Sequence, residues 1–207
     1  MKLLINQHKA AKQPTNQRAD SMPILGKEND IYPVDLLTDP QHLNDDQAIW
    51  YSVYTLSRRE KDLMRKLYSQ KIRFYGPVIT KRFRSPAGRM RTSYVPLFPN
   101  YVFMLANETD RYQAMTSNCI SKCNPVPDPQ QLIEDLQRIA NIIAQGEGLT
   151  PEARLETGQP VRVKSGPFAG YEGQVIRREG KTRFLLAVKF LEQGISIAMD
   201  EAMIDPL

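Results

Sequence analysis

Lysine and arginine are the residues whose spacing indicates the clearest chemistry in this sequence. Between Trp50 and Arg91 there are twelve of them against two acids, Glu60 and Asp62, a balance of +10 within a chain whose net charge is +5. Positive charge concentrated in one segment is typical of a protein that binds a polyanion such as nucleic acid. The alternative is a basic face that is merely solvated, because a run of like charge needs no partner.

Residue types used in catalysis are present, but their spacing matches no catalytic motif. The sequence contains no Gly-x-Ser-x-Gly turn and no phosphate-binding loop. Both histidines, His8 and His42, lie in a polar N-terminal stretch, which leaves the rest of the chain without an obvious general base. Cys119 and Cys123 have no second pair of ligands, so reduced structural cysteines are expected instead of a zinc site. We therefore predict no catalytic residues, no metal site, no cofactor and no enzymatic activity.

A helix that begins near Ser57 is expected to hold part of the basic segment. Ser57 with Glu60 three positions later is typical of a capping box at a helix start. Leu63, Met64 and Leu67 share one face of this helix, and basic residues lie opposite or beside that face. The basic residues are Arg58, Arg59, Lys61, Arg65 and Lys66. We predict that these five bind nucleic acid; Lys81, Arg82 and Arg84, near a hairpin, are the alternative location.

The remaining pattern predicts two domains. Residues 1–47 carry four prolines and no sustained period, so a largely disordered arm is expected. Residues 48–145 should form the first domain, residues 146–157 a linker, and residues 158–207 the second domain. Within the first domain we expect residues 72–80 and 83–96 to hold two strands around a turn at 86–88. A further strand is expected at 101–105, and helices at 110–118 and 129–143.

No apolar run in the sequence reaches the length of a membrane span. The apolar start Met1–Ile5 is too short for the core of a signal peptide. We therefore expect a cytoplasmic protein without a membrane partner.

The second domain contains a glycine-rich strand connection. Val161 and Val163 alternate with basic residues, Gly-Pro-Phe-Ala-Gly follows at 166–170, and a second strand starts after Gly173. Further strands are indicated by two alternating apolar sets, Phe184, Leu186, Val188 and Phe190, and then Ile195, Ile197 and Met199. This pattern resembles the KOW motif, which opens a small five-stranded barrel in factors that bind RNA, ribosomes or RNA polymerase.

A second resemblance lies upstream. The strand Trp50–Tyr54, a helix, and the segment Pro96-Leu97-Phe98-Pro99-Asn100-Tyr101-Val102-Phe103-Met104 are similar to the N-terminal domain of the NusG family. Asn100 is closer to the specialised RfaH- and UpxY-type paralogues, because general NusG proteins usually have glycine there. Together the two resemblances cover residues 48–207. They imply an α+β N-terminal domain, an antiparallel sheet with flanking helices, followed by a small all-β SH3-like KOW barrel.

The resemblance also implies a function and its sites. The chain is expected to be a transcription elongation or antitermination factor that binds RNA polymerase and touches the non-template DNA strand through the basic helix. The polymerase-binding residues implied are Phe98, Tyr101, Phe103, Ile133 and Leu136. In the KOW domain, Phe168 and Leu191 are the expected contacts to a ribosomal protein. Leu191-Glu192-Gln193 replaces the family's Phe-Gly-Arg turn, which argues against binding of the termination factor Rho.

Two other functions remain open on the sequence alone. A ribosome- or RNA-binding KOW protein would explain the C-terminal pattern, although the Leu-Phe-Pro-Asn-Tyr strand argues against it. A DNA-modifying enzyme would explain the basic segment, although the missing acid–base set argues against it.

Overall fold

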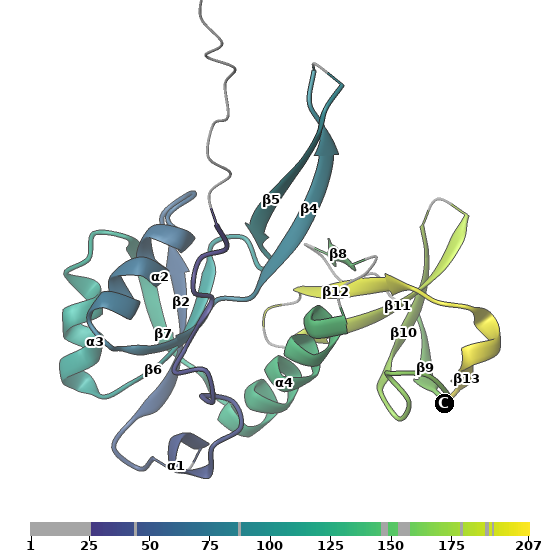
Figure 1. The fold of residues 1–207 in the computed structure, drawn as a ribbon. Coiled ribbons are helices and arrows are strands. Elements are labelled where there is room, and N and C mark those ends of the chain that lie inside the picture. The colour runs from purple at the N-terminus through teal and green to yellow at the C-terminus, as the bar shows by residue number, and fades with distance from the viewer. Residues whose placement is uncertain are drawn as a thin grey trace, which may run out of the picture.

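The two larger sheets of the protein are antiparallel and lie on either side of a long helix (Figure 1). A computed structural model describes residues 26–43, 45–86, 88–145, 149–152, 158–178, 180–188, 191 and 193–207. Figure 1 shows the first sheet with its helices on the left, the second sheet on the right, and α4 (Pro129–Gln145) between them. Among the described residues, no helix combines the length and apolarity needed to cross a membrane.

The first sheet has the strand order β1-β3-β6-β2-β7, and every neighbouring pair is antiparallel. Its strands are β1 (Ile31–Tyr32), β2 (Ile49–Thr55), β3 (Arg73–Tyr75), β6 (Tyr101–Ala106) and β7 (Ile120–Pro125). Alternation along β6 sends Val102 and Met104 to one face and Phe103 and Leu105 to the other. The two faces therefore build two different clusters of the core.

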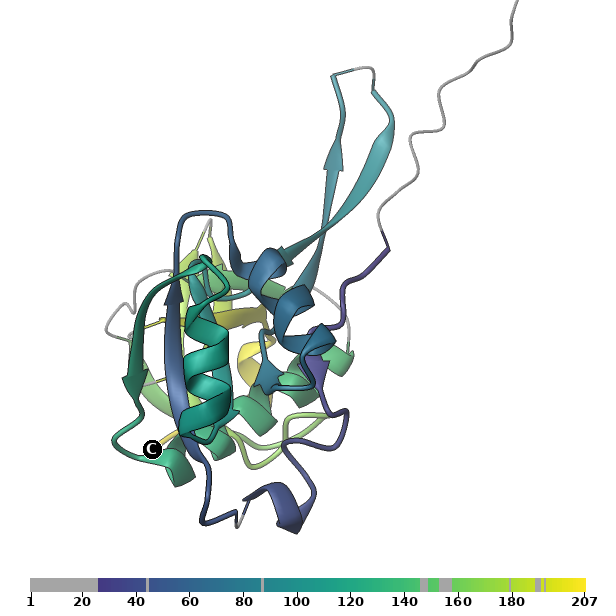
Figure 2. The same cartoon turned by 90° about the vertical axis from the view of Figure 1, so that its left-hand side faces the viewer.

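Helices α2 (Glu60–Ser69) and α3 (Glu108–Met115) cover the Val102 face, as Figure 2 shows. Leu63, Met64 and Leu67 of α2 are completely or almost completely buried there, as the helical spacing predicted. The other face packs against α4, which also contacts the second sheet through β11 (Lys181–Val188). Because α4 meets a partner on each side, its buried residues cover about half of the helix circumference. They are Leu132, Ile133, Asp135, Leu136, Ile139 and Ile142.

The segment before residue 48 differs from the expected disordered arm. Ile31 and Tyr32 pair with β3, and a short helix α1 follows at Pro40–Leu43. Leu36 and Leu37 are buried, and the side chain of Gln137 in α4 donates a hydrogen bond of 2.5 Å to the Leu37 carbonyl. These contacts bury enough apolar surface to order a short segment that has no period of its own. The rest of the expected arm, residues 1–25, lies outside the described residues.

The second sheet has the strand order β13-β9-β10-β11-β12-β8, again antiparallel throughout. Besides β11, its strands are β8 (Leu149–Glu152), β9 (Gln159–Val163), β10 (Glu172–Arg178), β12 (Gln193–Ala198) and β13 (Ile204–Pro206). Strand β8 falls inside the expected linker, where pairing with β12 orders it. Whether the sheet closes as an SH3-like barrel stays a prediction.

Two glycines of the expected strand connection have the geometry that the sequence predicted. Gly170 has φ +85°, and its N–H donates to the Val163 carbonyl at 2.7 Å. A Cβ on Gly173 would lie 2.4 Å from the Leu185 carbonyl oxygen. Both positions therefore require glycine.

Strands β4 (Val78–Arg84) and β5 (Met90–Pro96) form a third, two-stranded sheet. Figures 1 and 2 show this hairpin extending away from the rest of the molecule. The expected strand at 72–80 is therefore two strands, because β3 ends at Tyr75 and β4 leaves the first sheet after Pro77. A buried Gly76-Pro77 pair marks the change of direction.

Candidate functional site

The basic face of α2 is partly neutralised by acids. Arg59 lies 2.6 Å from an oxygen of Asp62, and Arg65 lies 2.7 Å from the other oxygen. Arg65 also contacts Glu28 at 2.7 Å, from the segment that was expected to be disordered. Hydrogen bonds from Arg65 and then Arg59 lower the pKa of Asp62, so this carboxylate stays charged at neutral pH. Two of the five predicted nucleic-acid-binding residues therefore already have anionic partners.

The Lys66 side chain binds to residues between α3 and β7. Its ammonium group donates to the Ser117 carbonyl at 2.7 Å and lies 3.5 Å from the sulfur of Cys119. Among the described residues, only Arg58 and Lys61 of the predicted five have no hydrogen-bonding or ionic partner for their side chains. Of the predicted basic face, these two are the cations available to a nucleic acid.

The capping box expected at the start of α2 does not form. The N-cap position is Arg59, without a side-chain capping bond, and Ser57 is exposed. Glu60 instead accepts a hydrogen bond of 2.7 Å from the backbone N–H of Asn100, forty residues away. That bond fixes the turn that enters β6. The Glu60 residue is 8% exposed.

Asn100 has φ +66°, in the left-handed region. Asparagine is one of the few residues other than glycine that adopts this region at low cost. The geometry explains why either Asn or Gly suits this position of the Leu-Phe-Pro-x-Tyr motif.

Of the five predicted polymerase-binding residues, only Tyr101 reaches the surface. Its ring stacks edge-on against Tyr54 with centroids 5.1 Å apart, and Tyr54 and the nearby Leu56 are 37% and 47% exposed. Phe98 and Phe103 are almost completely buried, with ring centroids 5.9 Å apart. The other two residues, Ile133 and Leu136, are also buried, in the cluster that joins α4 to both sheets.

The predicted partner contacts of the KOW domain are also inside the protein. Phe168 is 5% exposed and Leu191 is 9% exposed, and both belong to the core cluster. Phe168 packs near Tyr171, whose hydroxyl accepts a hydrogen bond of 3.1 Å from Asn141 of α4. The prediction that these two residues present a contact surface is therefore not supported, because both side chains belong to the core.

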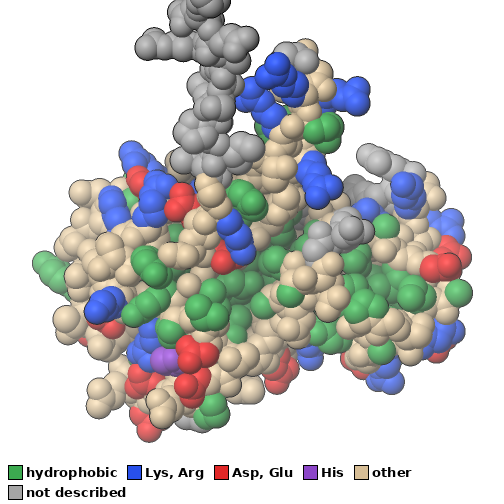
Figure 3. All heavy atoms as spheres, viewed as in Figure 1, with side chains coloured by type: hydrophobic (Ala, Val, Ile, Leu, Met, Phe, Trp, Pro, Cys, Tyr) green, Lys and Arg blue, Asp and Glu red, His purple; other side chains and the backbone are tan. Residues whose placement is uncertain are grey.

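Sequence reasoning missed one cluster of metal-ligating residue types. Ligand atoms of Asp35, Asp39 and His42 lie within 4.8 Å of one another around α1, the region of Figure 3 where acidic side chains surround the histidine. The Asp-x₃-Asp-x₂-His spacing was visible in the sequence, but Asp39 already has a structural role as the acceptor for the Gln41 N–H at 2.8 Å. The cluster gives no reason to revise the expectation of no metal site.

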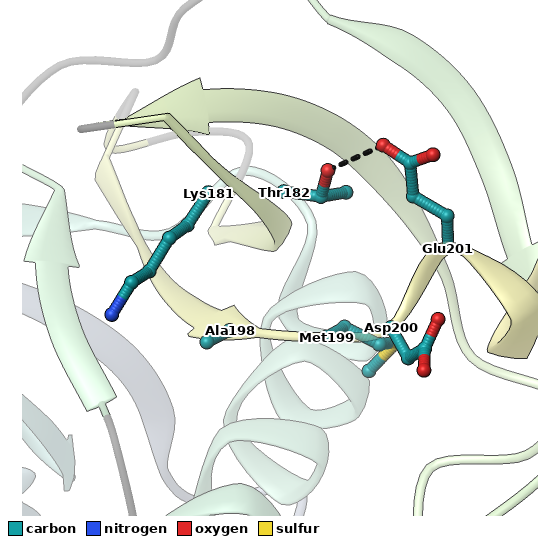
Figure 4. Close-up of a pocket in the computed structure, with 6 residues that line it drawn as sticks. All are labelled: Lys181, Thr182, Ala198, Met199, Asp200 and Glu201. Carbon is teal, nitrogen blue, oxygen red and sulfur yellow. Dashed lines mark hydrogen bonds between the residues drawn. The ribbon is translucent and has the colours of Figure 1, made fainter.

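The described residues form no arrangement suited to catalysis. Figure 4 shows an open hollow beside the second sheet, lined by Lys181, Thr182, Ala198, Met199, Asp200 and Glu201. Thr182 donates to Glu201 at 2.6 Å, while the Lys181 side chain points away from both carboxylates. Both cysteines are free; Cys119 is buried, and burial raises the pKa of Cys123 to about 11, which keeps it a neutral thiol.

A family model described as transcription termination factor nusG matches residues 48–154, just over half of the 207 residues. The chain belongs to the NusG family. A transcription termination/antitermination protein NusG from Pseudomonas aeruginosa is 25% identical over 177 residues, which cover 75% of this chain and 97% of that protein. The NusG of Staphylococcus aureus strain Mu50 is 28% identical over 143 residues, covering 61% of this chain and 77% of that protein.

The NusG family consists of transcription elongation, termination and antitermination factors. Its members are not enzymes, in agreement with the sequence prediction. Among solved structures, a chain of the MjSpt4:Spt5 complex (conformation B) is 17% identical and covers 77% of this chain and 97% of that chain. Its TM-score of 0.25 is too low to support any argument about the fold.

Proposed function

We propose that this NusG-family protein binds RNA polymerase, contacts the displaced non-template DNA strand, and keeps the elongating enzyme processive. The observation that carries the proposal is the family match over residues 48–154, which spans most of the first sheet, α2 and α4. The protein acts by binding alone, in the cytoplasm where bacterial transcription takes place. Asn100, in the left-handed turn before β6, supports a place among the specialised paralogues.

Polymerase docks on the surface around Tyr101 in this proposal. The half-buried Tyr101 and the exposed Tyr54 form an aromatic pair on neighbouring strands, and the exposed Leu56 extends the apolar surface. Aromatic anchors of this kind dominate the energy of protein interfaces. The core cluster beneath Tyr101 supports this surface. It includes the buried side chains of Phe98, Phe103, Ile133 and Leu136.

Single-stranded DNA binds beside α2, through Arg58 and Lys61. Both side chains lack partners within the described part of the chain, so neither must break an ion pair to reach a phosphate. Because Phe168 and Leu191 are buried, the proposal includes no ribosomal-protein contact through them. Rho is also left out, since the aromatic residue and arginine of the Phe-Gly-Arg turn are missing.

The test is a titration of the full chain against core RNA polymerase. Tyr101→Ala should weaken binding about 30-fold, which corresponds to about 2 kcal/mol for a lost aromatic anchor. Tyr112→Ala is the matched control, because Tyr112 is 71% exposed on α3, a different element of the first domain. Capture of ribosomes but not of polymerase by the wild-type protein would overturn the proposal in favour of a ribosome-binding KOW protein.

A further inference from the structure

The hairpin formed by β4 and β5, which we name the hairpin arm, carries charge that the proposed function does not use. Residues 78–96 include Lys81, Arg82, Arg84, Arg89 and Arg91 and contain no acid. All five side chains are exposed, and none has a hydrogen bond or ion pair with a described residue. Figure 3 shows Lys and Arg side chains gathered on the arm, away from the acidic atoms of that view.

The hairpin arm carries more unpaired charge than α2 does. On α2, Asp62 and Glu28 neutralise two arginines, and Lys66 is bonded to the first domain. On the hairpin arm, no acid among the described residues pairs with the cations. Exposed charges without partners keep their full attraction for a polyanion, because no existing ion pair has to be broken.

The strand register places cations on both faces of the arm. Directly opposed residues of an antiparallel pair share a face. Arg82 is opposite Thr92 and Arg84 is opposite Met90, so these two arginines lie on one face. Lys81 is opposite Ser93 and Phe83 is opposite Arg91, so Lys81 and Arg91 lie on the other face.

The base of the arm is anchored and its outer part is free. Val78 and Ile79 are buried, and the Leu97 N–H bonds to the Pro77 carbonyl at 2.7 Å. From Thr80 to Pro86 every described side chain of the outgoing strand is exposed except that of Ser85. Seven residues of strand reach about 20 Å, far enough for the arm to enter another molecule.

We propose that the hairpin arm inserts into the major groove of double-stranded DNA. A surface that docks flat on a polyanion needs cations on one face only, whereas a ribbon between two phosphate walls needs them on both. The B-form major groove, about 12 Å wide, admits a two-stranded ribbon. The major groove of an RNA duplex is too deep and narrow for this, which favours DNA.

Apolar side chains lie near the tip of the arm, which meets the floor of such a groove when the two faces meet its walls: Arg84 and Met90 form the last strand pair before the turn, and Phe83 belongs to the next pair. Phe83 and Met90 are 43% and 63% exposed, so their apolar side chains are available for contact with a partner. Thymine methyl groups offer apolar contact in the major groove, and Thr92 can donate to base edges or phosphates. This duplex site goes beyond the single-strand contact proposed for α2 and does not depend on polymerase binding.

Salt dependence of duplex binding tests the proposal. Fluorescence anisotropy would follow the full chain binding a labelled DNA duplex of about 20 base pairs, roughly two helical turns. Each phosphate contact adds about −0.9 to the slope of log affinity against log salt, so five contacts give about −4.5. Affinity should then fall about 500-fold between 50 and 200 mM salt.

Variants that remove charge from one face at a time distinguish insertion from flat docking. Arg82→Gln/Arg84→Gln and Lys81→Gln/Arg91→Gln should each flatten the slope by about 1.8. Lys122→Gln/Lys181→Gln is the control, since it removes the same charge from exposed lysines on other elements. All of these side chains are exposed, so unfolding midpoints should not change.

The salt slopes of these variants distinguish groove insertion from flat docking. Flattening by both arm variants, and not by the control, supports groove insertion. Flattening by one arm variant alone overturns insertion and shows flat docking on the backbone. Slopes of the arm variants that change no more than that of the control overturn the proposal. Tighter binding of the wild type to single-stranded DNA or to an RNA duplex than to duplex DNA, with the same flattening by the arm variants, also overturns it. Core polymerase binding by the arm variants, measured without nucleic acid, reports separately on the proposed function.

Discussion

Removal of the Glu60 carboxylate should loosen the turn that enters β6. Glu60 is 8% exposed, and its oxygen is the acceptor for the Asn100 N–H at 2.7 Å. In Glu60→Ala the amide loses a charge-assisted hydrogen bond, which costs about 2 kcal/mol. Glu60→Gln keeps an oxygen acceptor without the charge, so it should cost about half as much.

Hydrogen exchange at the Asn100 amide is the direct assay. A loss of about 2 kcal/mol corresponds to exchange about 30-fold faster in Glu60→Ala than in the wild type, if opening of this turn limits protection. Glu108→Ala is the matched control, because Glu108 also lies in the first turn of a helix but is exposed and pairs with Arg111. Equal exchange at Asn100 in Glu60→Ala and Glu108→Ala would refute the assigned role of Glu60.

Three further predictions follow from burial and ion pairing. Arg58→Gln/Lys61→Gln should flatten the slope of log affinity for single-stranded DNA against log salt by about 1.4. An equal flattening by Arg59→Gln/Arg65→Gln, which removes the two arginines paired with Asp62, would show that these ion pairs do not neutralise them. Phe103→Ala should lower the free energy of unfolding by about 3–5 kcal/mol, measured in urea, because Phe103 is completely buried; an unchanged midpoint would place Phe103 at a surface. Cys123 has a pKa raised to about 11, so at pH 8 it is a neutral thiol and should react with iodoacetamide more slowly than in the urea-unfolded chain. Equal labelling rates in the folded and unfolded chains would contradict its burial.

Elements with a long apolar period were predictable from the sequence. The helix expected at residues 129–143 is α4 at Pro129–Gln145, and the strand expected at 101–105 is β6 at Tyr101–Ala106. The strands expected in the second domain around Val161, Phe184 and Ile195 are β9, β11 and β12. In each case local periodicity and tertiary packing favour the same structure.

Contacts between distant segments were not predictable. Ile31 and Tyr32 form a strand only because the edge of β3 is available, which local sequence does not show. Glu60 matched a local capping motif, but an amide forty residues away competes for the same oxygen. The buried positions of Phe103 and Leu136 depend on α4 packing between two sheets, so residue type alone could not tell a contact surface from the core.

One part of the charge pattern could have been foreseen. Arg59, Asp62 and Arg65 are three residues apart in turn, a spacing that brings side chains together on a helix. That spacing predicts a neutralised face on α2. The absence of any acid between residues 78 and 96 likewise indicated that the cations of the hairpin arm have no acidic neighbour within the arm.

Single-round transcription by purified RNA polymerase, with and without the full chain, tests the central claim most directly. On a template with a strong pause and a terminator, saturating protein should shorten the pause or raise readthrough. Tyr101→Ala should need about 30-fold more protein for the same effect, while Tyr112→Ala should match the wild type. Pausing and readthrough that stay unchanged at saturating wild-type protein would contradict the proposed role in processive elongation.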